Sequence, residues 1–374
     1  MIPVFYEALD RVNNELVGML PSAVIDARAS AVKKGQKVEI PITPVSTNED
    51  VTPSSSAPVG NGETIDTTSI TIQKIKRGTP ILWTGEDELG VSGSGTLNQI
   101  QVDQFSQRIR SLRNEMEADM CAEAYGGAFS GGSILGSIGT NPFASNLNLL
   151  TEALQKLEDA GAPTSELQAI LNTESGRNLR NLTQLQKINE AGESSLLRRG
   201  ALGDLFGFTI RESNGMKHTK GDGTGYLTNS ESLAIGDTTI TIDTGSGTFK
   251  ENDIIKFADD DNYYVVAEDV ASGGTTLKLK TPLKTAVGNN KAITIQNAKP
   301  NACFARGSIL LASRVPYVPS RGDIAIDRQV ITDPLTGIPY ELAVWGGAYQ
   351  NSVTIATAWG VKNIKPENSV ALLG

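Results

Sequence analysis

The chain has 374 residues, 39% of them hydrophobic, and a formal net charge of −9. The length fits two or three domains, and the acidic balance excludes a protein whose whole surface is drawn to nucleic acid. With His218 as the one histidine and Cys121 and Cys303 far apart, multi-histidine metal sites and a disulfide framework are excluded. No apolar run reaches the roughly 20 residues of a membrane span, and we expect no signal peptide.

The first elements are predicted to be a helix, an arm and two paired strands. Residues 2–20 carry apolar side chains at steps of three and four, which predicts an amphipathic helix that gives way to an extended arm. Two strands follow, in KVEIPITPV and SITIQKIKRGTPILWT, separated by more than twenty residues that are mainly Ser, Thr, Pro, Gly and acids. This connection is either a disordered linker or a projecting hairpin that orders on a neighbouring subunit. The strands on both sides favour the hairpin.

The strongest helix pattern covers residues 97–125. Its apolar face repeats without a break at Val102, Phe105, Ile109, Leu112, Met116 and Met120. Its polar faces are supplied by Arg108, Arg110, Arg113, Glu115 and Glu117. The glycine run at 126–132 is expected to end it. A helix of this length spans roughly 43 Å, which favours a structural spine over an ordinary core helix.

Helices and strands alternate in the next region and strands dominate the end of the chain. Residues 148–161 predict a helix closed by Gly161, ELQAILN a strand, GRNLRNLTQLQKI a helix and FGFTIRES a strand, which together indicate a small mixed domain. Near the end, IAIDRQVITDP, IPYELAVW and SVTIATAWGVKNI are typical of consecutive antiparallel strands, forming an elongated sheet beside the long helix.

Residues 222–295 form a β-rich block. Short strands of period two, separated by glycine turns, predict a small barrel or sandwich. The block carries eleven acidic and six basic residues, so it holds much of the chain's acidity. Its flanks, FGFTIRES and NACFARGSILLAS, are predicted strands of one host domain. We therefore interpret the block as an insertion.

The candidate chemical sites are weak. Asp259-Asp260-Asp261-Asn262 lacks the spacing of a calcium loop, and we interpret it as a solvated hairpin tip, with a basic patch on a neighbouring chain as an alternative partner. His218 lies in a loop rich in Gly and Lys with no nucleophile signature, so we expect no catalysis there. The sequence has no Walker A lysine and no Rossmann fingerprint.

Charged clusters favour contacts between subunits. Glu86, Asp87 and Glu88 could in principle serve a glycosidase. Few aromatic residues are available to line a sugar cleft, so a helix N-terminus or a subunit contact is favoured. Arg108 and Arg110 have acids nearby on the same helix, which indicates ion pairs within or between subunits rather than nucleic-acid binding.

Taken in order, these segments resemble the major capsid proteins of tailed phages with the HK97-like fold, most closely the P22 coat-protein group. KVEIPITPV and SITIQKIKRGTPILW resemble the E-loop hairpin, and LNQIQVDQFSQRIRSLRNEMEADMCAEAY resembles the spine helix of the peripheral domain. NLLTEALQKLEDAGAPTSELQAILNTESGRNL is similar to the start of the axial domain, and DPLTGIPYELAVWGGAYQNSVTIATAWGVKNIKPE to the closing segment. The β-rich block stands where the P22 group carries its extra β-barrel domain.

The resemblance implies an α+β fold divided into seven regions. They are an N-terminal arm (1–34), an E-loop hairpin (35–84), a peripheral domain with the spine helix (85–143), an axial domain in two parts (144–214 and 299–322), an inserted β-barrel domain (215–298) and C-terminal strands (323–374).

The resemblance also implies a structural function and no enzyme activity. Many copies would form the pentamers and hexamers of an icosahedral phage head, with a scaffolding protein and a portal protein as partners. The shell would enclose double-stranded DNA without sequence-specific contacts. It would assemble in the host cytoplasm and reside in the virion, with no cofactor, metal or membrane. Lys74 and Lys76 could donate cross-links from the hairpin, but no cross-linking site is marked, so non-covalent contacts are expected.

The residues expected at contacts between subunits are Lys74, Lys76, Glu86, Asp87, Glu88, Arg108, Arg110, Asp259, Asp260 and Asp261. Three alternatives stay open. One is an encapsulin-like compartment shell, which shares the fold and holds a cargo enzyme. The others are a surface protein whose β block binds a ligand, and a hydrolase that uses the carboxylates at 86–88.

Overall fold

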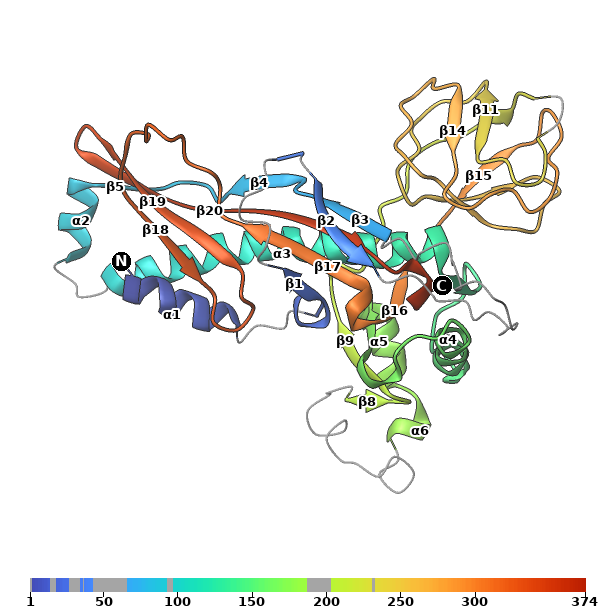
Figure 1. Ribbon diagram of the computed structural model, residues 1–374, viewed down its shortest axis with the longest axis horizontal. Helices are drawn as coiled ribbons and strands as arrows, with labels where there is room; N and C mark the ends of the chain where they lie inside the picture. The colour runs from blue at the N-terminus through green and yellow to red at the C-terminus, as the bar shows by residue number, and fades with distance from the viewer. Residues whose placement is uncertain are drawn as a thin grey trace, which may run out of the picture.

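The computed structural model describes residues 2–13, 18–26, 34–35, 37–42, 66–92, 97–186, 203–230 and 233–374. The molecule is elongated and is organised around one long helix, α3 (Leu97–Gly131) (Figure 1). A long sheet and α1 (Ile2–Asn13) lie along one half of α3. A second sheet with its helices and a separate β unit lie at the other end.

Helix α3 confirms the predicted spine and is longer than expected. Its 35 residues give a length of about 52 Å at 1.5 Å per residue. Every residue of the predicted apolar face is buried. The glycine run at 126–132 does end the helix, but at its second pair: α3 continues past the predicted residue 125, through Gly126 and Gly127, and ends at Gly131. The first pair allows close packing instead: a Cβ on Gly127 would lie 2.4 Å from the Asn363 side chain, and one on Gly126 would lie 2.8 Å from that of Asn252.

The long sheet packs against α3 and contains the predicted strands of the chain's end. Its order is β1 (Val24–Asp26), β17 (Ile309–Arg314), β20 (Gln350–Asn363), β19 (Pro339–Gly347) and β18 (Ala325–Thr332), and β20 also pairs with β4 (Lys74–Arg77) and β5 (Ile81–Thr84). Strands β18, β19 and β20 are antiparallel neighbours, as predicted. Phe5 of α1, Ile109 of α3 and Trp359 of β20 share the central core.

The start of the chain departs from the single helix predicted for residues 2–20. The described helix α1 ends at Asn13, residues 18 and 19 form a bend, and a short 3₁₀ turn covers Leu20–Ser22. Pro21 lies within that turn, where its fixed φ and missing N–H are tolerated. Strand β1 then extends along β17 and pairs with it in parallel, and the rest of the predicted arm, at 27–33, lies outside the described residues.

The second sheet has the order β6 (Ser133–Gly136), β21 (Ser369–Leu373), β16 (Asn301–Ala305), β7 (Leu167–Leu171), β9 (Phe208–Glu212) and β8 (Asp204–Leu205). Helices α4 (Asn148–Asp159) and α5 (Thr173–Arg180) bury Leu150, Leu157 and Leu179 against it. Gly161, at φ +73°, follows the end of α4 as predicted. The helix predicted for GRNLRNLTQLQKI is interrupted at Asn181–Leu182, before the short α6 (Thr183–Gln186).

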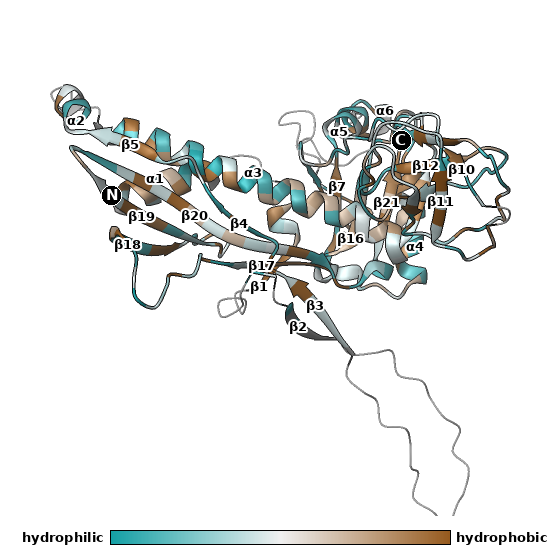
Figure 2. Cartoon of the chain, turned by 90° about the horizontal axis from the view of Figure 1, so that it is seen from above, coloured by the Kyte–Doolittle hydropathy of each residue, from teal (hydrophilic) through white to brown (hydrophobic). Residues whose placement is uncertain are grey.

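Of the two predicted hairpin strands, the first pairs only with the start of the second, because the rest of SITIQKIKRGTPILWT forms β4 and β5 and pairs with β20 instead. β2 (Lys37–Ile42) and β3 (Asp66–Thr71) form an antiparallel two-stranded sheet that extends away from the body (Figure 2). Ile70 and Ile72 anchor its base in a small core with Leu310, Ala312 and Ala358. The connection at 43–65, for which a projecting hairpin was predicted, lies outside the described residues.

The β-rich block lies between two strands of one sheet. β9 and β16 both pair with β7, so the chain leaves the second sheet after β9 and returns to it at β16. In between, β10 (Leu227–Thr228), β11 (Thr239–Asp243) and β14 (Thr276–Lys278) form one three-stranded sheet, and β13 (Tyr264–Val265), β12 (Ile254–Phe257) and β15 (Ile293–Gln296) form another. Isolated bridges join the two sheets, and the unit has a hydrophobic core of its own.

Candidate functional site

Glu117 is a buried junction between three parts of the chain. Its Oε1 accepts hydrogen bonds from the backbone N–H groups of Gly18 and Met19, at 3.1 and 2.9 Å, and from the Ser213 hydroxyl at 2.6 Å. It therefore ties the segment after α1 and the end of β9 to the spine. The prediction that Glu117 lies on a polar face of α3 is wrong, because the chain covers that face.

Arg113, also predicted on a polar face, forms a buried ion pair. Its side chain is 2% exposed and contacts Asp333, which is 0% exposed and follows β18. Its Nε also donates to the Tyr340 hydroxyl at 3.3 Å. A buried charge pair is strongly destabilised when one partner is removed, so Arg113 fixes the β18–β19 corner on the spine.

The lysines proposed for subunit contacts bind within the chain. Lys74 Nζ lies 2.8 Å from Asp119 Oδ1 and 3.2 Å from Glu115 Oε1, and Lys76 Nζ lies 3.4 Å from Glu115 Oε1. Burial opposes the charge of Lys74, but the hydrogen bonds to the two carboxylates outweigh it and raise the pKa of Lys74 above 10.5. These pairs hold β4 on the spine.

The other two arginines of α3 are also engaged. Arg108 Nε donates to the Thr79 carbonyl at 3.1 Å, and its side chain lies against Gly78. Arg110 also has an interaction partner. A contact of Arg108 or Arg110 with a neighbouring subunit remains a prediction.

The carboxylates at 86–88 lie in the first turn of α2 (Gly85–Ser92), as the helix N-terminus interpretation predicted. Asp87 caps this helix: its Oδ2 accepts from Thr84 Oγ1 at 2.6 Å and from Thr84 N at 3.2 Å, and its own N–H donates to Thr84 Oγ1. These hydrogen bonds, the one from the Thr84 hydroxyl above all, lower the pKa of Asp87. Glu86 and Glu88 are exposed and line a pocket of about 540 Å³.

The aspartates at 259–261 divide into two exposed side chains and one buried. Asp259 pairs with Lys291 at 2.6 Å, and Asp261 with Lys256 at 2.9 Å. Asp260 is 6% exposed and accepts from the Tyr264 hydroxyl at 2.7 Å. The interpretation of a solvated tip is therefore wrong for Asp260. Its carboxylate is buried and accepts hydrogen bonds within its own turn, so it is not available for a contact with a neighbouring subunit.

His218 lies at the junction between the β unit and the spine. Its Nε2 is 2.8 Å from Asp253 Oδ1, and its Nδ1 is 3.4 Å from the Tyr125 hydroxyl. Asp253 is fully buried and also accepts from the N–H groups of Gly221 and Lys250. A tyrosine of α3 is thus linked to an aspartate of the β unit through one imidazole, which is a structural connection between two parts of the fold.

In the part of the chain that the structure describes, no group of three or more His, Cys, Asp or Glu side chains is placed to hold a metal ion. Among the helices that the structure describes, none combines the length and apolar character that crossing a bilayer requires.

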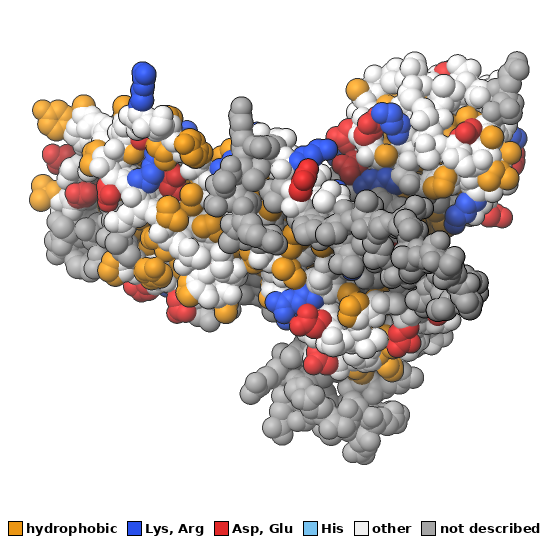
Figure 3. Space-filling view, viewed as in Figure 1, with side chains coloured by type: hydrophobic (Ala, Val, Ile, Leu, Met, Phe, Trp, Pro, Cys, Tyr) orange, Lys and Arg blue, Asp and Glu red, His pale blue; other side chains and the backbone are white. Residues whose placement is uncertain are grey.

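Exposed apolar side chains gather around the free end of the long sheet, at the left of Figure 3. Of the thirteen large apolar residues that are exposed in the described part of the chain, eight lie in the ranges 82–89 and 317–349: Leu82, Leu89, Tyr317, Ile324, Ile326, Val330, Leu335 and Tyr349. This region includes β18, which is at one edge of the described sheet. An exposed apolar surface beside a sheet edge is typical of a protein that associates with another chain.

Comparisons with known proteins find structural likeness only. No family model and no curated protein matches the chain. A structure from Mycobacterium phage Che8 is similar at 14% identity and a TM-score of 0.50, covering 95% of this chain and 90% of that one. The capsid of cyanophage P-SCSP1u is similar at 12% identity and a TM-score of 0.49, covering 94% and 86%. A virus-like particle from Pyrococcus furiosus is similar at 10% identity and a TM-score of 0.45, covering 99% and 98%.

The likeness to the Che8 chain extends over nearly the whole of both chains and shows a shared fold. The protein thus has the α+β, HK97-like capsid fold expected from its sequence. The grouping with P22 coat proteins and the division into seven regions remain predictions.

Proposed function

We propose that this chain is the major capsid protein of a tailed phage, with a structural and not an enzymatic role. The observation that supports this most directly is the fold shared with the Che8 phage chain over 95% of the sequence. An elongated body and a two-stranded hairpin that extends from it suit a subunit that makes its contacts with other copies (Figures 1 and 2). The apolar side chains exposed at 82–89 and 317–349 suit the same role, because burying them requires a partner.

The proposal includes the partners that the sequence led us to expect. Copies of the chain form pentamers and hexamers of an icosahedral head, assembled in the host cytoplasm with a scaffolding protein and a portal protein. The net charge of −9 is consistent with enclosing DNA without binding it tightly.

The test is to express the chain alone and together with a scaffolding protein from the same phage, and to examine the product by sedimentation and negative-stain electron microscopy. We expect rings or closed shells of uniform size. A chain that remains monomeric at high concentration under both conditions would contradict the proposal. Shells that enclose an enzyme rather than DNA would instead support the compartment-shell alternative.

A further inference from the structure

A pocket opens at the free end of the long sheet, between α2 and the β19–β20 hairpin. It has a volume of about 540 Å³, and Trp83, Glu86, Glu88 and Tyr349 are among the residues that line it. Tyr349 is 97% exposed and has a φ of +56°, in the left-handed region that non-glycine residues rarely adopt. The Tyr349 backbone forms part of the turn between β19 and β20, but its exposed side chain buries almost no surface in the isolated subunit, so a contact for it is expected outside the subunit.

The charge of the pocket indicates what it would accept. Asp87 is used as the helix cap, whereas Glu86 and Glu88 have no ion-pair partner within the part of the chain that the structure describes. Two free carboxylates beside Trp83 and Tyr349 fit a guanidinium with a neighbouring apolar side chain, because such a group pairs with carboxylates and stacks on aromatic rings.

The loop between β17 and β18 carries this combination. Gly322 N donates to the Pro319 carbonyl at 2.8 Å, which closes a turn with Arg321 exposed on it. Tyr317 and Ile324, on either side of the turn, are 82% and 86% exposed. Arg321 has no ion-pair partner among the described residues, whereas the adjacent Asp323 pairs with Arg328.

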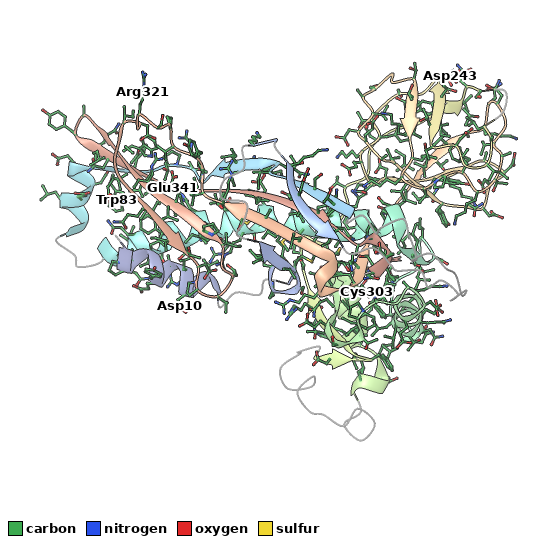
Figure 4. The ribbon with its side chains drawn as sticks, in the orientation of Figure 1. Asp10, Trp83, Asp243, Cys303, Arg321 and Glu341 are labelled. Atoms are coloured by element: carbon green, nitrogen blue, oxygen red, sulfur yellow. The ribbon has the colours of Figure 1, made fainter. Side chains whose placement is uncertain are left out.

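Arg321 of the loop and Trp83 of the pocket lie at separate places on one subunit. Figure 4 shows Arg321 pointing away from the body on the upper side, while Trp83 lies near α2 at the end of the molecule. Arg321 therefore points out into solvent rather than toward the pocket of its own chain. A contact in which two different surfaces of identical chains meet is heterologous, and such contacts close into rings when the rotation between copies permits.

We propose that the turn at 319–322 of one copy docks into the pocket at 83–88 and 347–351 of a second copy, with Arg321 paired to Glu86 and Glu88. This rests on the proposed function, because the occupant is another copy of the same chain. Tyr317 and Ile324 of the first copy contact the exposed Tyr349, Leu82 and Leu89 of the second. The charged pair sets which surfaces meet, and the apolar contacts supply most of the affinity.

A charge-reversal cycle tests the pairing. Glu86→Lys with Glu88→Lys in one chain, and Arg321→Glu in another, are each expected to lower the fraction of subunits in shells at least tenfold. Combining the three changes in one chain is expected to restore assembly to within threefold of the unchanged protein. The matched control is Glu152→Lys with Glu158→Lys on α4, two exposed acids outside this contact, which is expected to assemble normally.

Intermolecular cross-linking separates this contact from the proposed function. Chains carrying Glu88→Cys and chains carrying Arg321→Cys are mixed and oxidised, and a covalent dimer should form that is absent when Glu152→Cys replaces Glu88→Cys. If shells form but this dimer does not and the reversals have no effect, the contact is wrong and the capsid function stands. If the dimer forms but shells never do, the contact stands and the capsid function is wrong. Loss of assembly in both reversals without rescue would also overturn the pairing.

Discussion

Glu117 lies in the middle of α3 and joins three parts of the chain through one carboxylate oxygen. The donors are the N–H groups of Gly18 and Met19 and the hydroxyl of Ser213, all in buried surroundings. A donor left without an acceptor in such a place costs about 1–3 kcal/mol. The sequence pattern of α3 identifies its apolar face, but it gives no sign that the adjoining flank, which carries Arg113 and Glu117, is buried as well.

Replacing Glu117 with Ala should therefore lower the free energy of unfolding of dissociated subunits by about 2–4 kcal/mol. Glu117→Gln keeps an acceptor oxygen and should cost less. The measurement is urea unfolding followed by tryptophan fluorescence. Glu115→Ala is the control on the same helix: it loses partly exposed ion pairs to Lys74 and Lys76, so its effect should stay within about 1 kcal/mol. Equal losses for Glu117→Ala and Glu115→Ala would rule out the junction.

Glu123 should give the stability of the subunit a specific pH dependence. Burial is the main cause that raises the pKa of Glu123 above its ordinary 4.5, although its Oε1 accepts from Asn363 N at 2.9 Å. The folded state thus holds this proton more tightly than the unfolded chain. The stability linked to this group is fully present below pH 4.5 and is lost as pH rises through the raised pKa.

Glu123→Gln should remove that dependence, because an amide keeps the acceptor oxygen and does not ionise. We expect the variant to match the original chain below pH 4.5 and to become relatively more stable toward pH 8. Denaturant titrations at several pH values give the difference in the free energy of unfolding between the variant and the original chain. The contributions of the other titrating groups are the same in both proteins and cancel in this difference. A difference that stays constant across the range would show that Glu123 ionises without penalty.

At the scale of elements, Gly360 determines how the hairpin meets the long sheet. It lies in β20, where a Cβ would approach the Thr71 carbonyl oxygen to 2.0 Å. Gln73 N donates to the Trp359 carbonyl at 3.1 Å, and Lys362 Nζ donates to the Ser69 carbonyl at 3.0 Å. The base of the hairpin is therefore laid across β20 at a separation that only glycine permits.

Gly360→Ala should push β3 away from β20 and destabilise this contact by about 1–3 kcal/mol. Hydrogen exchange of the β3 amides should become faster while that of α3 stays unchanged. Gly307→Ala is the matched control, because a Cβ there has no neighbouring atom within 4 Å and its φ is not positive. Unchanged exchange in β3 after Gly360→Ala would mean that the hairpin is held elsewhere.

The elements that the sequence predicts are those with a clear period. The apolar spacing of α3 and α4 and the alternation in β18 to β20 identify them locally. The end of α3 is missed because glycine usually stops a helix, whereas here Gly126 and Gly127 admit neighbouring side chains. β21 is missed, although β7 and β16 are buried at every residue in the same way and are predicted. Its place between β6 and β16 depends on pairing across the whole chain, which no local pattern encodes.

For the whole molecule, the β unit contributes to two hydrophobic cores, one of its own and one that it shares with α3. Tyr226, Phe257 and Tyr264 belong to its own core. Ile254 and Val265 instead belong to the central core that includes α3. The chain enters and leaves the unit from one sheet, so the unit is an insertion in the sequence. It also packs on α3 through Ile254 and Val265, and His218 links it to Tyr125 of the same helix.

Replacing residues 222–295 by a short linker tests whether the rest of the chain needs the β unit in order to fold and assemble. We expect the second sheet to form, because β9 and β16 each pair with β7 independently of the insert. The last turns of α3 should lose cover where Tyr125 and Gly126 now pack, which lowers the yield of folded subunits and widens the size distribution of shells. Circular dichroism measures the folding of the subunits, and electron microscopy measures the size distribution of the shells. Normal yield and uniform shells would mean that the unit serves neither folding nor assembly.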